Sequence, residues 1–216
     1  MIDEYYKKKK EYDKIGNNRR KGILSLLGSY EGKKILDVGC GMGHLGRILK
    51  ENTQCIVDGI DISEDAIRNA SDVLDSSYVA DLEHGNLPDA LVQSTYDVIV
   101  ISEVLEHLFY PEKILSKISH LCTKDTKVIV TVPNILFIKN RIRILFGSFE
   151  YAESGLMDRG HIHFFSWKSL GEMIRSEHFK MIHTQHNFPM RFTKILGRVF
   201  PGVFAKQFII SLQYEN

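Results

Sequence analysis

The sequence contains little cysteine, little proline and no long apolar run, and each shortage excludes a class of protein. Its three cysteines are an odd number and lack metal-binding spacing, so we expect small buried thiols. Only five prolines, with 25% charged residues, exclude a fibrous or disordered chain. No apolar run reaches membrane-spanning length, and residues 1–10 lack the apolar stretch of a signal peptide. We therefore expect a cytoplasmic protein without a transmembrane segment.

The chain also lacks an excess of charge of either sign. Its 28 basic and 27 acidic residues leave a net charge of +1, so nothing attracts a polyanion generally and we do not expect a nucleic-acid partner. The 216 residues, 44% of them hydrophobic, suffice for one sizeable core. We therefore predict a single domain over residues 1–216.

Apolar strand-like runs alternate with helical segments through most of the chain. This alternation predicts an α/β fold with a mostly parallel sheet that is covered on both faces. The expected strands are 34–38, 55–60, 77–80, 97–101, 127–132, 179–186 and 206–214. The expected helices are 3–14, 18–28, 43–51, 64–74, 111–121 and 166–177.

Four glycines crowd the segment ILDVGCGMGHLG, residues 35–46, directly after the first strand. A strand, a glycine-rich turn and a helix together form a nucleotide-type loop, in which a ligand approaches bare backbone. The dinucleotide-binding pattern would require a third glycine at position 44, where the sequence has His44, and no lysine follows as in a phosphate-binding loop. Asp37 would repel phosphate and favours a cationic group.

Four motifs in order resemble the class I S-adenosylmethionine-dependent methyltransferases. They are Ile35-Leu-Asp37-Val-Gly39-Cys-Gly41-Met-Gly43, Val57-Asp-Gly-Ile-Asp61-Ile62-Ser63, Ala80-Asp81-Leu82-Glu83 and Tyr96-Asp-Val-Ile-Val-Ile-Ser102-Glu103-Val-Leu-Glu106-His107-Leu108. The resemblance covers nearly the whole chain and implies a Rossmann-like, seven-stranded sheet with a small helical cap. The implied organisation is N-terminal helices in 1–30, a cofactor-binding half in 31–134, a cap insertion in 135–165, and C-terminal strands and helices in 166–216.

The resemblance also implies which residues hold S-adenosylmethionine. Asp37 would face the cofactor ammonium, Asp61 would accept from both ribose hydroxyls, and Asp81 would accept from the adenine amino group. Ser102 and Glu103 would face the methyl-bearing sulfur and the acceptor. The remaining residues assigned to the cofactor are Gly39, Gly41, Gly43, Leu45, Ile62, Leu82 and Arg20, the last by likeness to an arginine of ubiquinone-type O-methyltransferases that binds the cofactor carboxylate.

Histidines and glutamates near the fourth motif supply candidate catalytic groups. Methyl transfer to a hydroxyl benefits from a general base, and we assign this chemistry to Glu106, His107 and His163, with His161 nearby in the sequence. Two interpretations of the segment 103–107 stay open: a short helix that shapes the cofactor pocket, or a divalent metal site formed by Glu103, Glu106 and His107. Similar clusters hold a metal in ubiquinone-type O-methyltransferases.

Three functions remain in competition. The first is O-methylation of a small molecule, such as a sugar, a glycan intermediate or an acidic metabolite. The second is metal-dependent 2′-O-methylation of small-RNA 3′ ends, because His163 stands four residues before Trp167 as the metal-binding histidine does in those enzymes. The third is a cofactor-binding protein without catalysis. Intact Asp37, Asp61 and Asp81 argue against the third.

Two apolar and basic segments, 135–149 and 190–204, stand outside these motifs. They predict a cap over the acceptor, a dimer surface or a membrane-surface patch. We prefer the cap, whose basic residues would suit an anionic small-molecule acceptor, and a homodimer is also possible.

Overall fold

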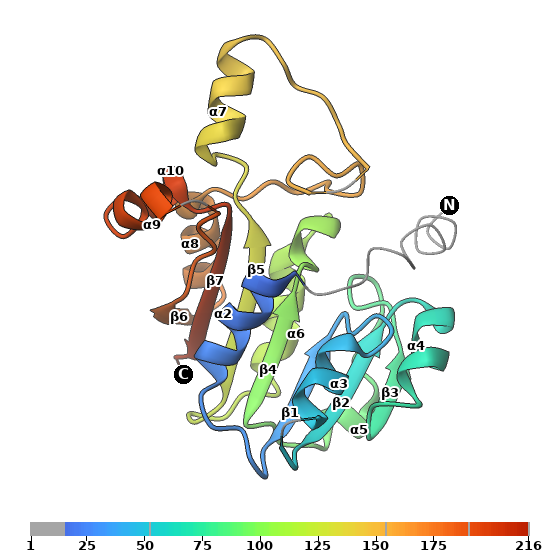
Figure 1. Cartoon of the computed structure of the whole chain (residues 1–216). Helices are drawn as coiled ribbons and strands as arrows, with labels where there is room; N and C mark the ends of the chain where they lie inside the picture. The colour runs from blue at the N-terminus through green and yellow to red at the C-terminus, as the bar shows by residue number, and fades with distance from the viewer. Residues whose placement is uncertain (1–15, 52, 154, 190, 216) are drawn as a thin grey trace.

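The computed structural model describes residues 16–51, 53–153, 155–189 and 191–215. A seven-stranded sheet in the order β3-β2-β1-β4-β5-β7-β6 runs through the molecule (Figure 1). All strand pairs are parallel except those that β7 makes with β5 and β6. The strands are β1 Lys34–Val38, β2 Ile56–Asp61, β3 Ser76–Val79, β4 Val98–Ser102, β5 Lys127–Pro133, β6 Phe179–Thr184 and β7 Gln207–Tyr214. The predicted α/β fold is confirmed.

Helices cover both faces of the sheet. The core on one face includes side chains of α2, α3 and α4, and the core on the other includes side chains of α5, α6 and α8. The helices are α2 Asn17–Leu27, α3 His44–Lys50, α4 Glu64–Ala70, α5 Asp89–Val92, α6 Pro111–Ser119, α7 Ile138–Leu145, α8 Trp167–Ser176, α9 Arg191–Gly197 and α10 Pro201–Phe204, with a 3-10 turn η1 at Leu105–His107. The helix predicted over residues 3–14 lies outside the described residues.

The strand order reverses at β1. Strand β1 lies between β2 and β4. After β1 the chain forms β2 and β3 on one side of it, and then crosses over to form β4 and β5 on the other side. Ligands of such sheets bind at this reversal, outside the carboxyl ends of the strands. Register places Asp37 of β1 beside Gly59 and Val100, two residues before the ends of β2 and β4. The predicted cofactor motifs therefore meet at one edge of the sheet.

Local signals at several helix ends explain where the elements begin. Ser63 accepts a hydrogen bond from the Ala66 amide at 3.2 Å, which satisfies an orphan donor at the start of α4. Ser166 and Ser169 form a reciprocal capping box at the start of α8. Predicted helix ends were less accurate: α4 ends at Ala70 instead of residue 74, because a turn follows there.

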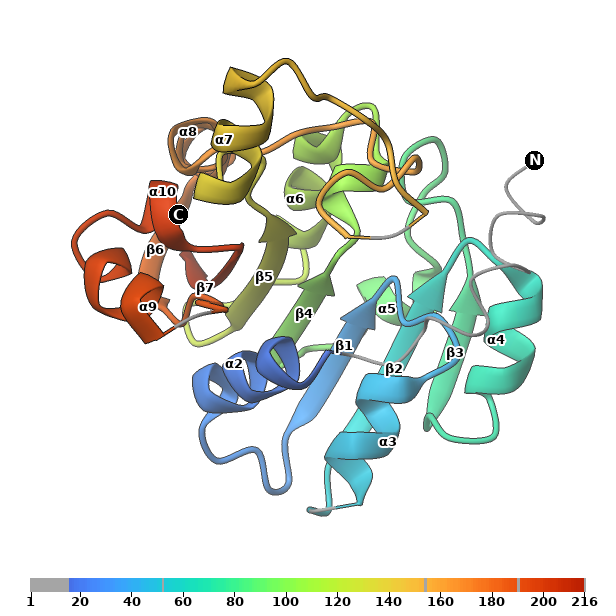
Figure 2. The same ribbon diagram turned by 45° about the horizontal axis from the view of Figure 1, so that its top comes forward.

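The segments that follow β5 and β6 contain the remaining helices. The expected cap region contains α7, and the apolar segment 190–204 contains α9 and α10 as separate short helices. In both views α7 and the α9–α10 pair lie at the same end of the sheet (Figures 1 and 2). Across the residues described, none of the helices combines the length and apolarity needed to cross a bilayer.

Candidate functional site

The glycine loop between β1 and α3 is fixed by backbone hydrogen bonds to the end of β2. The amides of Gly39 and Cys40 both donate to the Ile60 carbonyl, at 2.8 and 3.1 Å. Gly39, Gly41 and Gly43 have φ values of 71°, 53° and 76°, which side-chain-bearing residues rarely adopt. A Cβ at position 39 would also lie 2.3 Å from Val104 Cγ2. The loop conformation and the close approach of the segment after β4 therefore both require glycine at position 39.

Asp37 and Asp61 are buried at the carboxyl ends of β1 and β2. Asp37 is 3% exposed and Asp61 is 6% exposed. The Asp61 carboxylate accepts from the Gly41 amide at Oδ2 and from the Ser63 amide at Oδ1, both at 2.9 Å. Asp61 thus fixes the glycine loop, a structural role beside the ribose contact that the sequence predicts. Ile62, 39% exposed, follows directly and presents an apolar side chain beside it.

Asp81 follows β3, at the same edge of the sheet. Its carboxylate accepts from the Glu83 and His84 amides at 2.9 and 3.1 Å and contacts the His84 ring at 3.0 Å. Burial alone would raise the pKa of Asp81, but these hydrogen bonds outweigh it and hold the pKa below its ordinary value. An ionised acceptor is what recognition of an adenine amino group requires. The adjacent Leu82 is 8% exposed.

The segment after β4 carries a strained residue. Glu103 has a φ of 58°, in the left-handed region that residues other than glycine rarely occupy. Its carboxylate accepts from Gln207 at 2.7 Å and from Thr131 at 3.2 Å, and forms an ion pair with Arg19 at 3.2 Å. Ser102 lies beside it, with its hydroxyl 3.1 Å from that of Thr131.

The Arg19 ion pair was not predicted from the sequence, which pointed to Arg20. Arg19 lies three and four residues before Gly22 and Ile23, the buried residues of α2, so it shares their face. This face packs on β5 and β7, and it carries the Arg19 guanidinium to Glu103. The assignment of Arg20 to the cofactor carboxylate stays a prediction, as does that of Leu45, whose side chain is buried in the core with α2 and α4.

Glu106, His107 and His161 form the candidate metal group found among the described residues. One ligand atom from each lies within 4.8 Å of the others. Glu106 is 1% exposed, and its Oε1 lies 4.0 Å from His161 Nε2. Backbone hydrogen bonds join the two segments, because the amides of Ile162 and His163 both donate to the Glu106 carbonyl at 3.0 Å.

Backbone carbonyls orient both imidazole rings of this group. His107 Nδ1 lies 2.8 Å from the Gly160 carbonyl, and His161 Nδ1 lies 3.3 Å from the Leu156 carbonyl. A carbonyl only accepts, so a neutral ring at either position would carry its proton on Nδ1 and its lone pair on Nε2. Two imidazole lone pairs and a buried carboxylate in one group form a donor set that suits a borderline divalent cation or a proton relay.

This group corrects the metal site expected from sequence. One of the two open interpretations joined Glu103 to Glu106 and His107, but the Glu103 carboxylate is bound by Arg19, Gln207 and Thr131. Within the described part of the chain, the group contains neither Glu103 nor His163. The His163 ring lies 4.9 Å from the Phe165 ring. His161 therefore faces Glu106, whereas the His163 ring packs beside Phe165.

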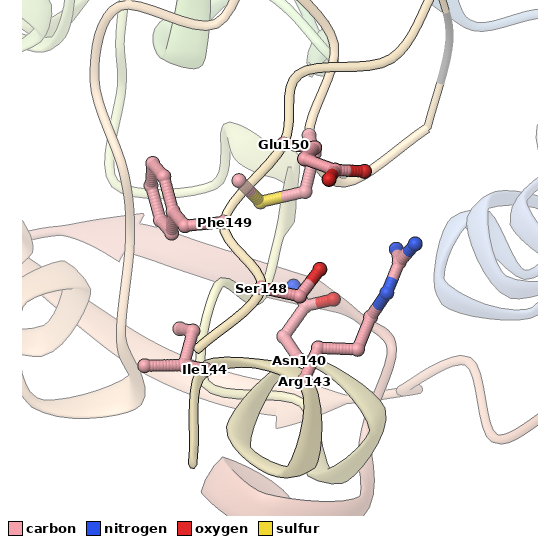
Figure 3. A pocket seen from close by; sticks show the side chains of 7 residues that line it. Asn140, Arg143, Ile144, Ser148, Phe149 and Glu150 are labelled. Carbon is pink, nitrogen blue, oxygen red and sulfur yellow. The ribbon is translucent and has the colours of Figure 1, made fainter. Parts of the chain in front are cut away.

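A small pocket lies between α7 and the segment that follows it. Figure 3 shows side chains that line it from both. The lining residues are Asn140, Arg143, Ile144, Ser148, Phe149, Glu150 and Met157. Its enclosed volume of about 10 Å³ is far below the roughly 300–1,000 Å³ of small-molecule sites. It therefore offers at most part of an acceptor site.

Comparisons with known proteins identify the family of this chain. Residues 11–184 match a family model described as a methyltransferase domain. A ubiquinone biosynthesis O-methyltransferase of Neisseria meningitidis is 28% identical over 141 residues, which cover 62% of this chain and 59% of that protein. A mitochondrial counterpart of Schizosaccharomyces pombe is 38% identical over 93 residues, covering 40% of this chain and 32% of that protein. The chain thus matches only part of the length of these relatives.

Solved structures share the fold. A S-adenosylmethionine-dependent methyltransferase from Aquifex aeolicus superposes with a TM-score of 0.65 at 17% identity, covering 97% of this chain and 98% of the other. Magnesium protoporphyrin IX methyltransferase from Synechocystis, solved with bound S-adenosylhomocysteine (SAH), gives 0.61 at 17% identity, covering 89% and 79%.

Proposed function

Because the chain belongs to the methyltransferase-domain family and is a class I S-adenosylmethionine-dependent methyltransferase, we propose that it methylates a hydroxyl oxygen of a small-molecule acceptor. The observation that carries this proposal is the group of Glu106, His107 and His161 just beyond β4. That position borders the edge of the sheet where the cofactor motifs meet. An acceptor hydroxyl there would have a base within reach.

The chain's own residues divide the work of binding and orienting. S-adenosylmethionine supplies the methyl group from its sulfonium centre when bound. Asp37 and the glycine loop would hold its amino-acid end, Asp61 its ribose and Asp81 its adenine. Residues 156–163 return over Glu106 through backbone hydrogen bonds and help to exclude water from the acceptor. Alignment of the reacting atoms by such walls supplies about 7–11 kcal/mol of a barrier.

A phenolic hydroxyl suits this site better than an aliphatic hydroxyl. An imidazole base removes a proton more easily from a phenol, with a pKa near 10, than from an alcohol, which is a far weaker acid. The relatives named for ubiquinone biosynthesis support the same class. We therefore propose a hydroxylated aromatic acceptor, with sugar, glycan and acidic acceptors as the alternatives.

We also propose that the group of Glu106, His107 and His161 binds a divalent metal. Its donor set fits such an ion, since two rings have their Nδ1 atoms held by backbone carbonyls and the carboxylate is buried. A bound divalent cation would favour the ionised form of an acceptor hydroxyl. Without a metal, His107 would take the proton alone.

The acceptor proposal is tested by methyl transfer from labelled S-adenosylmethionine to matched compounds. We expect turnover of a catechol carboxylate, and none of the same ring with both hydroxyls already methylated. A nucleotide-linked sugar and a short RNA complete the panel. Turnover of the sugar or the RNA, with none of the catechol, would contradict the aromatic assignment.

The metal proposal is tested by the metal content of purified variants. We expect wild type incubated with Mn²⁺ and desalted to retain the metal, and His161→Ala and Glu106→Gln to lose it. His163→Ala and Glu103→Gln, which alter residues outside the group, should retain it. Calorimetric titration with SAH checks that each variant keeps its fold. Loss of metal from His163→Ala but not from His161→Ala would refute the ligand set.

A further inference from the structure

Helix α7 turns an apolar stripe away from the rest of the molecule. Ile142, Leu145 and Phe146 are 49%, 80% and 80% exposed, and they fall within about 100° of one another around the helix. The opposite side is less exposed: Asn140 there is 5% exposed and donates to the Ile135 carbonyl at 3.1 Å, and Ile144 is 45% exposed. Ordinary surface helices bury their apolar stripe, so α7 has the reverse orientation.

Basic side chains border this stripe on both sides. Lys139 and Arg143 lie along one border and Arg141 along the other, and all three are exposed. Long basic side chains can extend alongside an apolar stripe while their charged groups reach a polar layer. An apolar centre with cationic borders is the arrangement of a helix that lies in a membrane interface.

The α9–α10 region extends the same surface. Ile195, Val199 and Phe200 are 73%, 70% and 58% exposed, with Lys194 and Arg198 exposed among them. The two regions are joined at their bases, because the Asn134 amide donates to the carbonyls of Gly202 and Ala205 at 3.1 and 2.8 Å. They lie at one end of the sheet in both views (Figures 1 and 2).

The charge of this surface indicates which kind of partner it binds. Segments 135–149 and 190–204 hold six of the 28 basic residues and none of the 27 acidic ones, so the rest of the chain carries a net negative charge. A second copy meeting this surface through a two-fold axis would bring like charges together. Nucleic acid would satisfy the charges but leave the apolar stripe in water. An anionic bilayer offers phosphates to the basic side chains and an apolar layer to the stripe.

We propose that α7 and α9–α10 form an interfacial surface that docks this enzyme on membranes rich in anionic lipid. The apolar stripe enters the boundary between headgroups and acyl chains, and the basic borders contact lipid phosphates. The inference concerns a surface distinct from the Glu106 group and does not depend on the identity of the acceptor. Docked in this way, the enzyme would meet amphiphilic acceptors at the membrane surface.

Vesicle co-sedimentation of the full chain tests the proposal. We expect binding to vesicles of equal parts phosphatidylglycerol and phosphatidylcholine, weak binding to phosphatidylcholine alone, and a decline as salt rises. Lys139→Gln with Arg143→Gln should weaken binding by roughly tenfold or more, since each interfacial charge contributes about fivefold. Leu145→Gln with Phe146→Gln should weaken it as well.

Control variants change two apolar and two basic side chains at the opposite, amino-terminal edge of the sheet. The apolar control changes Ile56 and Val92, which are 49% and 53% exposed, and the basic control changes the half-buried Lys33 and the exposed Lys124. These controls should bind vesicles as wild type does, and SAH titration should be unchanged in every variant. Equal binding of wild type to both vesicle types would overturn the proposal. So would a gel-filtration shift from dimer to monomer in Leu145→Gln with Phe146→Gln, which would assign the surface to a second copy.

Discussion

Replacing Gly39 by alanine should separate two costs that the glycine loop avoids. At a φ of 71°, an alanine destabilises the folded state by about 1–2 kcal/mol, because its Cβ crowds the backbone in the left-handed conformation. Its Cβ would also lie 2.3 Å from Val104 Cγ2, and overpacking of this kind costs about 1–3 kcal/mol. We therefore expect Gly39→Ala to lower the free energy of unfolding by about 2–5 kcal/mol and to weaken SAH binding as the loop shifts.

A second substitution separates the cost of the steric clash from the cost of the left-handed backbone. Val104→Ala removes the atom that the new Cβ would meet, so in a double-mutant cycle it should recover about 1–3 kcal/mol of the loss. The backbone cost should remain. Gly32→Ala is the matched control, because Gly32 has a φ of 69° and a Cβ added there would meet nothing within 4 Å, so it should lose only about 1–2 kcal/mol.

Urea unfolding followed by the fluorescence of Trp167, the single tryptophan, measures each stability, and calorimetry measures SAH affinity. If the costs of Gly39→Ala and Val104→Ala simply add, the contact between these positions does not limit the loop and the reasoning fails. Gly32→Ala losing as much as Gly39→Ala would refute it in the same way.

Two further predictions concern a carboxylate and a buried histidine. Asp61→Ala should weaken SAH binding by about 1–3 kcal/mol through lost charge-assisted hydrogen bonds, while exposed Asp72→Ala should not, and unchanged calorimetry for Asp61→Ala would rule out its ribose role. His186 lies 5.1 Å from the Trp167 ring and 5.5 Å from that of Phe208, and burial lowers its pKa from 6.5 to about 4. Between these values the unfolded chain binds a proton that the folded chain does not, so stability falls as pH drops from 6.5 toward 4, by about 3 kcal/mol in full. His186→Phe should flatten urea-derived stability across this range relative to the exposed His183→Phe, and equal slopes in both variants would contradict the assignment.

The sheet and the cofactor motifs were predictable because their signals are local. Apolar runs and intervening helices indicated each strand to within about two residues, and the run Asp97–Ile101 differs from observed β4 by one residue at each end. Asp37, Asp61 and Asp81 lie at or just after strand ends, and parallel strands bring such ends to one edge. Their common location therefore followed from chain order and the direction of the crossovers.

The composition of the candidate metal group depended on tertiary structure. Glu103 and Glu106 have the spacing of neighbours on a helix, but the chain forms a 3-10 turn, and Glu103 adopts a left-handed conformation that turns its carboxylate to Arg19. The sequence pointed to His163, because of its spacing from Trp167, but the structure places His161 beside Glu106. Only the backbone pairing of residues 162 and 163 with Glu106 decides which ring faces it.

The sequence by itself determined the sheet, the glycine loop and the cofactor edge, since each depends on the pattern of neighbouring residues. Tertiary structure alone decided that Arg19 meets Glu103, that His161 joins Glu106 and His107, and that the apolar stripe of α7 faces outward. These outcomes depend on the direction of single side chains. That direction is set by contacts between segments more than 50 residues apart, as between His107 and Gly160, which no local pattern encodes.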